Sequence, residues 1–191
     1  MITSKNEFRY YLLKDKEALR IRRDKPQLFG DEIWIFQRLL RKYEYLNNCR
    51  PYGFFTHIIL LLTRYRFHNL SLKLGFSIPI NVFGPGLSIV HYGTIVVSQG
   101  AKIGKNCRIH EGVTIGATNG SSKAATIGDN VFIGSGAKII GEVNIPNNVA
   151  IGANAVVVKD IVCELLGGTV GGVPAKMISN KNSSSNIFVK D

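Results

Sequence analysis

The chain has 191 residues, with 24 Lys and Arg against 13 Asp and Glu, and 45% of its residues are hydrophobic. This length allows one or two domains, and the apolar fraction excludes a wholly disordered chain. The three scattered cysteines, Cys49, Cys107 and Cys163, match neither a disulfide framework nor a zinc spacing. The first residues lack a signal-peptide core, and no apolar run approaches the ~20 residues of a membrane span. We therefore expect a soluble protein of the reducing cytoplasm.

The first 75 residues differ in composition from the rest of the chain. They contain 13 of the 18 aromatic residues but only 3 of the 20 glycines. Apolar side chains at helical spacing predict helices at about 5–22, 32–47 and 51–74, the second capped by Asp31. We interpret residues 1–75 as an α-helical N-terminal domain.

Basic and aromatic residues alternate in this region, which carries 15 basic and 7 acidic side chains. Such a pattern fits a surface for nucleic acid or an anionic membrane. A solvated face of packed helices explains it more simply. We expect no nucleic-acid partner and leave open that a membrane surface lies nearby.

From Phe83 onward an apolar residue recurs about every six positions, with glycine often directly after it. A smaller residue follows four places after most members of the series, as Cys107 does after Ile103. The series is Phe83, Ile89, Val97, Ile103, Ile109, Ile115, Ile127, Ile133, Ile139, Ile145, Ile151 and Val157.

A six-residue period is typical of a parallel β-helix, in which three short faces complete a coil of ~18 residues. We predict a mainly β domain over residues 76–178, with the large residue of each hexapeptide pointing inward. The helical region can cover one end of the coils, and the segment after Val157 can cover the other. Residues 179–191 are expected to form a flexible tail.

Two intervals depart from the six-residue period. Between Ile115 and Ile127 we expect a protruding loop, Asn119–Ala125, because Ser121 would otherwise occupy an inward apolar position. The eight-residue interval between Ile89 and Val97 contains His91. Irregular segments on a rigid scaffold often contain functional residues.

These repeats resemble the hexapeptide-repeat acyltransferases. Residues 86–97 (GLSIVHYGTIVV) and 112–116 (GVTIG) are similar to the serine acetyltransferase branch, and residues 172–176 (GVPAK) to the C-terminal signature of the superfamily. A short helical N-terminal part with this variant of the β-helix resembles capsule and exopolysaccharide O-acetyltransferases. The resemblance implies a left-handed β-helix, acetyl-CoA as donor and no metal. It also implies homotrimers or dimers of trimers, with acetyl-CoA bound between adjacent β-helices.

The resemblance assigns catalysis to His91 as a general base that takes the proton of an acceptor hydroxyl. A group titrating near neutrality suits that step and the later protonation of the CoA thiolate. Glu111 lies one coil beyond His91 and is our candidate for orienting the imidazole, the alternative being a solvated surface glutamate. His110 is the rival base.

The resemblance also implies positions for acetyl-CoA. Ser135 and Ala153 would face the pantetheine arm, and Lys159 and Lys176 would approach the phosphates. A basic side chain near a phosphate forms charge-assisted hydrogen bonds. The alternative for each lysine is an exposed charge on a turn.

Three departures from the serine enzymes bear on the acceptor. Their carboxylate partner of the histidine falls at Phe76, the acidic residue before it is Val90, and the loop's Arg-His pair is replaced around Lys123 and Ala124. On this basis we predict O-acetylation of a sugar hydroxyl in a capsular or exopolysaccharide, or in its precursor. The alternative is serine O-acetylation in cysteine biosynthesis.

Two other classes of protein share this scaffold. A metal-dependent carbonic anhydrase needs three histidines, whereas only His91 and His110 lie in the repeats. A non-catalytic scaffold or glycan-binding protein also remains open, because a fold does not determine a function. Binding of acetyl-CoA would distinguish such a scaffold from an enzyme.

Overall fold

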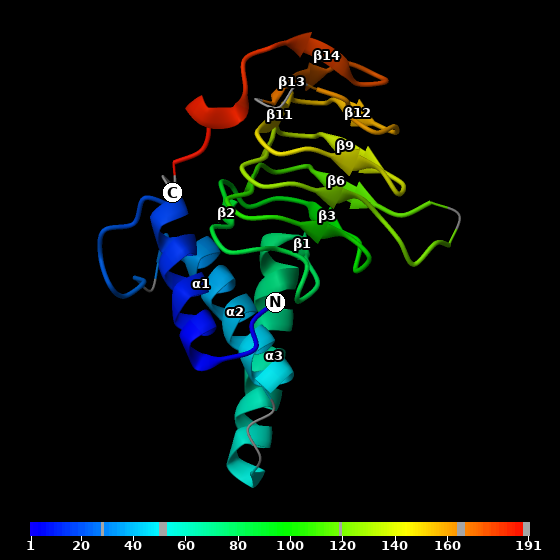
Figure 1. The fold of residues 1–191 in the computed structure, drawn as a ribbon. Coiled ribbons are helices and arrows are strands. Elements are labelled where there is room, and N and C mark those ends of the chain that lie inside the picture. The colour runs from blue at the N-terminus through cyan, green and yellow to red at the C-terminus, as the bar shows by residue number, and fades with distance from the viewer. Residues whose placement is uncertain (28, 50–52, 119, 164–166, 189–191) are drawn as a thin grey trace.

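The computed structural model describes the whole chain except residues 28, 50–52, 119, 164–166 and 189–191. Three helices come first, and short strands stacked in layers follow above them (Figure 1). The helices are α1 (Lys5–Ala18), α2 (Glu32–Cys49) and α3 (Phe54–Leu74). They agree with the three predicted helices, although the predicted start of the third falls in the undescribed segment 50–52.

Local backbone features determine where the helices end. The Ser4 hydroxyl accepts a hydrogen bond from the Glu7 amide and caps α1, which ends earlier than predicted because Arg20 turns left-handed at φ +57°. Gly75 ends α3 at φ +76°, a conformation that glycine adopts without steric cost. Asp31 was expected to cap α2, but its carboxylate accepts hydrogen bonds from the Gln27 amide and the Arg23 guanidinium.

The strands have two to four residues each, and the chain visits three sheets in rotation. Neighbouring strands within a sheet are parallel, apart from the last pair. Sheet A contains β1 (Phe76–Ser77), β3 (Ile95–Val97), β6 (Thr114–Gly116), β9 (Lys138–Ile140) and β12 (Val156–Val157). Sheet B contains β4 (Lys102–Ile103), β7 (Thr126–Ile127) and β10 (Asn144–Ile145). Sheet C contains β2 (Ser88–Ile89), β5 (Arg108–Ile109), β8 (Phe132–Ile133), β11 (Val149–Ile151), β13 (Gly168–Gly171) and β14 (Lys176–Ser179).

The core lies between the three sheets and confirms the six-residue pattern. Every large residue of the series, from Phe83 to Val157, is buried, and so are the small residues that follow four places later. Because the side chains of a strand alternate between its faces, the residues next to each large one point outward. The period of the sequence therefore predicted which side chains are inside.

Asparagines form a ladder at the corner between sheets B and C. Asn106, Asn130 and Asn148 all have positive φ, and each amide donates to the next, at 2.9 Å and 3.1 Å. Asparagine tolerates the left-handed conformation and also satisfies its neighbours' side chains there. The ladder holds successive coils in register.

The description as mainly β needs correction. Helices of 14, 18 and 21 residues contain more of the chain than the short strands, so the protein is of mixed α and β structure. The parallel sheets and the preceding helices agree with the predicted architecture. The left-handedness of the coil and the domain boundaries at 75 and 178 stay predictions.

The helical region covers the first edge of the coils through buried polar contacts. The Gln37 side chain donates to the Leu87 carbonyl at 2.7 Å and accepts from the Ile89 amide at 3.2 Å, so it binds the free edge of β2. Arg41 donates to the carbonyls of Phe83 and Gly84. These bonds satisfy backbone groups that an open edge would leave unpaired.

The C-terminal segment returns from the far end of the coils toward the helices (Figure 1). β14 pairs antiparallel with β13, and the Ser183 hydroxyl, in the short 3₁₀ helix Ser183–Ser185, donates to the Asn130 carbonyl. The described part of the predicted tail therefore makes specific contacts. Its flexibility stays a prediction, and residues 189–191 lie outside the described part.

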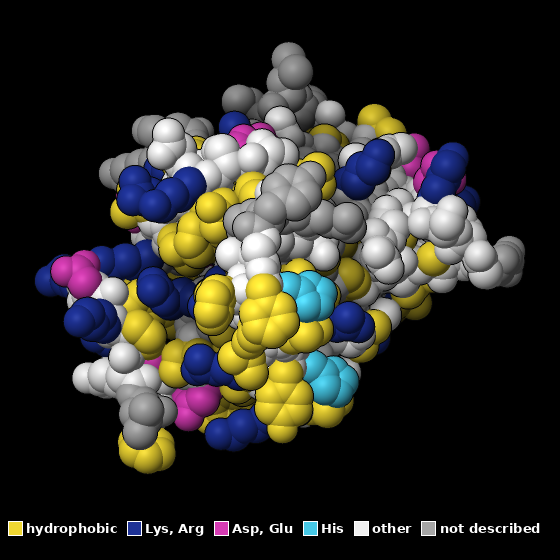
Figure 2. All heavy atoms as spheres, turned by 90° about the horizontal axis from the view of Figure 1, so that it is seen from below, with side chains coloured by type: hydrophobic (Ala, Val, Ile, Leu, Met, Phe, Trp, Pro, Cys, Tyr) yellow, Lys and Arg dark blue, Asp and Glu magenta, His cyan; other side chains and the backbone are white. Residues whose placement is uncertain are grey.

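The exposed surface of α3 includes several large apolar side chains. Phe54, Phe55, Leu61, Leu62 and Tyr65 are exposed, and seen from below the helical end presents apolar side chains among Lys and Arg (Figure 2). Within the described residues, no helix combines the length and apolarity needed to cross a bilayer. Contact with a membrane surface stays a prediction.

Candidate active site

His91 and Glu111 occupy equivalent positions on successive coils. Ile89 of β2 pairs with Ile109 of β5, so the residues two places later, His91 and Glu111, follow the same edge of sheet C. The same register continues through β8 and β11 to Ser135 and Ala153. One corner, between sheets C and A, therefore holds four of the predicted site residues.

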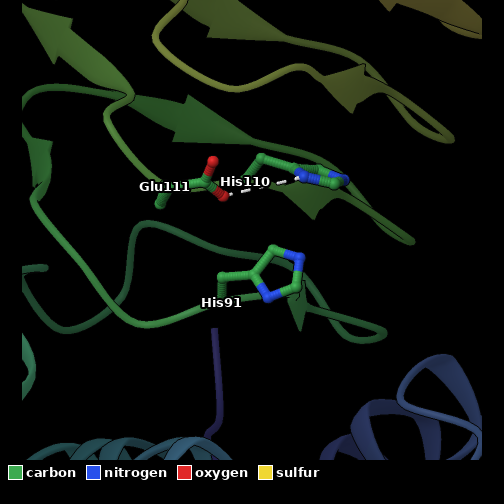
Figure 3. Close-up of side chains that lie close together, drawn as sticks. All are labelled: His91, His110 and Glu111. Carbon is green, nitrogen blue, oxygen red and sulfur yellow. Dashed lines mark ion pairs between the residues drawn. The ribbon is translucent and has the colours of Figure 1, made fainter.

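His91, His110 and Glu111 lie together at this corner (Figure 3). Each offers a nitrogen or carboxylate oxygen, and these atoms lie within 4.8 Å of one another. The rings of His91 and His110 meet edge to face with centroids 5.8 Å apart. His91 is exposed, whereas His110 is partly covered by Phe132, 5.2 Å away between ring centroids.

Glu111 is held beside the two imidazoles. Its Oε2 lies 3.8 Å from Nδ1 of His110, and this oxygen is buried without a hydrogen-bond partner among the described residues. A hydrogen bond from Ser135 is the main cause that lowers the pKa of Glu111. An ionised carboxylate with a free oxygen favours a protonated imidazole next to it.

Burial lowers the pKa of His110, and the nearby charge of Arg108 lowers it further. Glu111 acts in the opposite direction and raises it. His110 therefore favours the neutral form near pH 7, in which one ring nitrogen can accept a proton. This state is the one that the alternative role of His110 as the base requires.

The same three side chains are suitable ligands for a divalent metal. Two imidazoles and a carboxylate form a set that zinc uses in catalytic sites, with a fourth position open. The resemblance to acetyltransferases implies no metal, and that expectation stays a prediction.

The predicted cofactor positions divide into two groups. Ser135 and Ala153 follow β8 and β11 at the corner of His91, and Lys176 pairs with Gly171 at the end of β13. Lys159 follows β12, at the opposite end of the sheet A strands, and is exposed. Within one chain, Ser135 bonds Glu111 beside the candidate base, and Ala153 lies one coil further along the same corner. Lys159 does not lie at this corner.

The loop after β6 is shorter than predicted. Ala124 and Ala125 are buried in the core, so the segment that leaves the coil ends before them, and Asn119 lies outside the described residues. Lys123 is exposed and pairs with Glu142 at 3.1 Å. A buried methyl at Ala124 offers no polar group to a substrate.

Two further expectations concern buried side chains. Phe76 is buried and packs edge to face on Phe36, with centroids 5.0 Å apart, so it cannot orient an imidazole through a hydrogen bond. Burial raises the pKa of the Cys107 thiol to about 12, which leaves too little thiolate for nucleophilic catalysis. Cys107 is a packing residue, as its inward position predicted.

Arg108, on β5, is a residue next to this corner that was not predicted from the sequence. Its side chain points outward from β5, as that of His110 two residues later does, because residues i and i+2 share a face. The only signal in the sequence was an arginine at an outward position just before His110. This signal is weak, because the repeats contain several lysines at similar outward positions.

Proteins of similar sequence are serine acetyltransferases, whereas no protein-family model matches the chain. The serine acetyltransferase of Synechococcus elongatus is 38% identical over 97 residues, which are 50% of this chain and 38% of that protein. That of Mycobacterium tuberculosis is 37% identical over 108 residues, 56% of this chain and 46% of that protein. The matched region thus spans less than half the length of these relatives.

Solved structures of serine acetyltransferases share most of the fold. The Brucella abortus enzyme in complex with coenzyme A covers 93% of this chain and 70% of its own, at a TM-score of 0.68 and 26% identity. The Neisseria gonorrhoeae enzyme in complex with serine covers 90% of this chain and 69% of its own, at 0.65 and 26% identity. The chain is thus similar to hexapeptide-repeat acetyltransferases, and within them to the serine acetyltransferases.

The comparisons overturn the predicted sugar acceptor. Both the sequence relatives and the structural neighbours are serine acetyltransferases, and nothing in them supports a capsular or exopolysaccharide substrate. The prediction had relied on three substituted positions, Phe76, Val90 and the loop around Lys123. The loss of individual substrate contacts at these positions does not outweigh the similarity over the whole repeat region.

Proposed function

We propose that this protein transfers the acetyl group of acetyl-CoA to the hydroxyl of L-serine. This proposal is supported by one observation: the comparisons of sequence and of fold both lead to serine acetyltransferases. The relatives are serine acetyltransferases, and the structural neighbours include complexes with coenzyme A and with serine. We propose a direct transfer without a covalent acyl-enzyme, because the buried thiol of Cys107 is not a suitable nucleophile.

In this proposal His91 is the general base. It takes the proton of the serine hydroxyl while the oxygen attacks the thioester carbonyl. The carbon–sulfur bond then breaks, and the imidazolium returns the proton to the CoA thiolate. Exposure of His91 at a corner supports this role, because both substrates can reach it.

Glu111 is proposed as the positioning residue for the imidazolium. Ser135 holds its carboxylate, and the unpartnered Oε2 lies close to both histidines. Replacing Glu111 by Gln should lower kcat about 10- to 100-fold, the value of a charge-assisted hydrogen bond. The KM for acetyl-CoA should stay the same, and Glu111→Asp should restore part of kcat. An unchanged kcat would exclude this role.

Acetyl-CoA is proposed to bind along the corner of His91. Ser135 and Ala153 would face the pantetheine arm, and Lys176 would approach a phosphate. Lys159 lies at the other end of the sheet A strands, so it would act from a neighbouring copy of the chain. We accordingly propose a homotrimer or a dimer of trimers, with each cofactor site between two chains.

Release of CoA thiol from acetyl-CoA tests the activity. We expect release that depends on L-serine and falls by two to four orders of magnitude in His91→Ala, the range of general base catalysis. His68→Ala is the matched control, because that histidine is exposed on α3, on the helical end of the molecule. A purified, folded protein without serine-dependent release would contradict the proposal.

A further inference from the structure

Arg20 and Arg108 converge on one aromatic ring next to the candidate site. The Arg20 guanidinium carbon lies 3.3 Å from the centroid of the Phe188 ring, and that of Arg108 lies 4.3 Å from the same centroid. Arg20 follows α1, Arg108 belongs to β5 and Phe188 to the C-terminal segment. Three distant parts of the chain thus bring two like charges together.

Neither arginine forms an ion pair with a described residue. The acidic groups of α1 are engaged elsewhere, since Asp15 binds Arg41 and Glu17 binds Lys14. Burial lowers the pKa of Arg108, and so does the nearby charge of Arg20. Two adjacent cations that no carboxylate of the described residues pairs with repel each other, and a bound anion would relieve this cost.

A pocket of about 320 Å³ opens beside the pair. Leu19, Ser88, Ile89 and Val90 line it together with the arginines and Phe188. This volume is at the lower end of small-molecule sites and suits a compact ligand. Val90, one of the lining residues, directly precedes His91 in the sequence, so the pocket begins one residue from the candidate base.

The outward face of β5 connects the pocket with the histidines. Arg108 and His110 point to the same side of the strand, and the His110 ring contacts that of His91. Arg108 is also close enough for its charge to lower the pKa of His110. A small molecule held by Arg108 would therefore have its other end near the imidazoles.

We propose that Arg20 and Arg108 bind the carboxylate of the amino-acid acceptor. The inference rests on the proposed function and names a site for the charge that a serine acceptor brings. A guanidinium suits a carboxylate because its N–H groups can donate two parallel hydrogen bonds. The loop after β6 offers a lysine, Lys123, that is already paired with Glu142, and a buried Ala124. The arginine pair supplies the cation that this loop does not.

Steady-state kinetics with L-serine and L-serinamide test the assignment, since the amide lacks the carboxylate charge. We expect Arg108→Gln to raise the KM for L-serine about 10- to 100-fold. The KM for acetyl-CoA and the use of serinamide should change little. Arg108→Lys should recover part of the loss, and Arg20→Gln should act in the same direction as Arg108→Gln. Lys102→Gln, which removes an exposed charge from sheet B, is the matched control.

The outcomes separate this inference from the proposed function. Serine acetylation with an unchanged KM in Arg108→Gln overturns the inference alone. An increase in the KM for acetyl-CoA rather than L-serine also overturns it and assigns the pair to a phosphate. If the wild type does not acetylate serine, the proposed function fails. Calorimetric titration with L-serine then tests whether the pocket binds the amino acid. Binding of L-serine to the wild type that is lost in Arg108→Gln supports the carboxylate site. No binding of L-serine to the wild type overturns it.

Discussion

Arg41 donates to the Asp15 carboxylate at 2.8 Å, and both side chains are buried between the helices and the first coil. Asp15 in turn accepts the amides of Gly86 and Leu87, so one carboxylate joins α1, α2 and the start of sheet C. Glu44 completes the network, at 3.0 Å from Arg41. The helical region is thus fixed to the coils by charge as well as by apolar packing.

The Arg41 network predicts a large effect of a single substitution on stability. Arg41→Gln leaves the carboxylates of Asp15 and Glu44 buried without their cation. We expect it to lower the free energy of unfolding by about 3–5 kcal/mol. Urea denaturation monitored by circular dichroism measures this change. Lys42→Gln, at the exposed neighbouring position, should change the free energy by less than about 0.5 kcal/mol. Equal effects of the two variants would refute the role of the network.

The asparagine ladder predicts that backbone and side chain contribute separately at Asn130. Asn130→Ala loses two side-chain hydrogen bonds and places a β-carbon at φ +55°, so we expect a destabilisation of about 2–3 kcal/mol. Asn130→Gly loses the same bonds without the backbone strain and should be about 1 kcal/mol more stable than Asn130→Ala. Thermal denaturation compares the two. An alanine variant as stable as the glycine variant would show that the left-handed backbone costs nothing here.

The electrostatics of the candidate site predict opposite shifts of one pKa. Arg108→Gln removes a positive charge and should raise the pKa of His110. Glu111→Gln removes a negative charge and should lower it. Titration of the imidazole signals by NMR, assigned with His110→Asn, measures both shifts. A shift in the same direction in the two variants would contradict the observed arrangement of charges.

The ligand set at the corner predicts the response to metals. Removal of metal by a chelator should leave acetyl transfer unchanged, because the proposed reaction needs only the imidazole. Added Zn²⁺ should inhibit, since it would occupy the lone pair of His91 together with His110 and Glu111. His110→Asn should weaken this inhibition about tenfold by removing one ligand. Inactivation by the chelator would instead indicate that the metal is part of the active enzyme.

Local rules predicted the repeats and their stacking. The inward positions follow from a six-residue period, and counting along that period placed Glu111 one coil beyond His91, as the pairing of Ile89 with Ile109 requires. The early end of α1 could not be predicted in this way. Arg20 is an ordinary residue in the sequence, and its left-handed backbone accompanies a contact with Phe188, far along the chain.

The site was predictable only where its members share a repeat. His91, Glu111, Ser135 and Ala153 recur at one corner, whereas Arg20, Arg108 and Phe188 meet through packing between distant elements. No periodicity in the sequence indicates such a meeting. The predicted acceptor was wrong for a related reason, because single substituted positions do not show which groups from distant elements meet at a site.

The coils differ in length, and the two largest additions lie at two corners. Sheet C neighbours are 20 residues apart across the His91 corner, 24 across the loop after β6 and 18 between β8 and β11. The strands on either side of each longer corner keep their pairing. Segments can therefore be inserted or exchanged there while the rest of the protein folds as before. Such an arrangement lets descendants of one scaffold acquire new substrates by changing a few turns, with little risk to the stability of the whole.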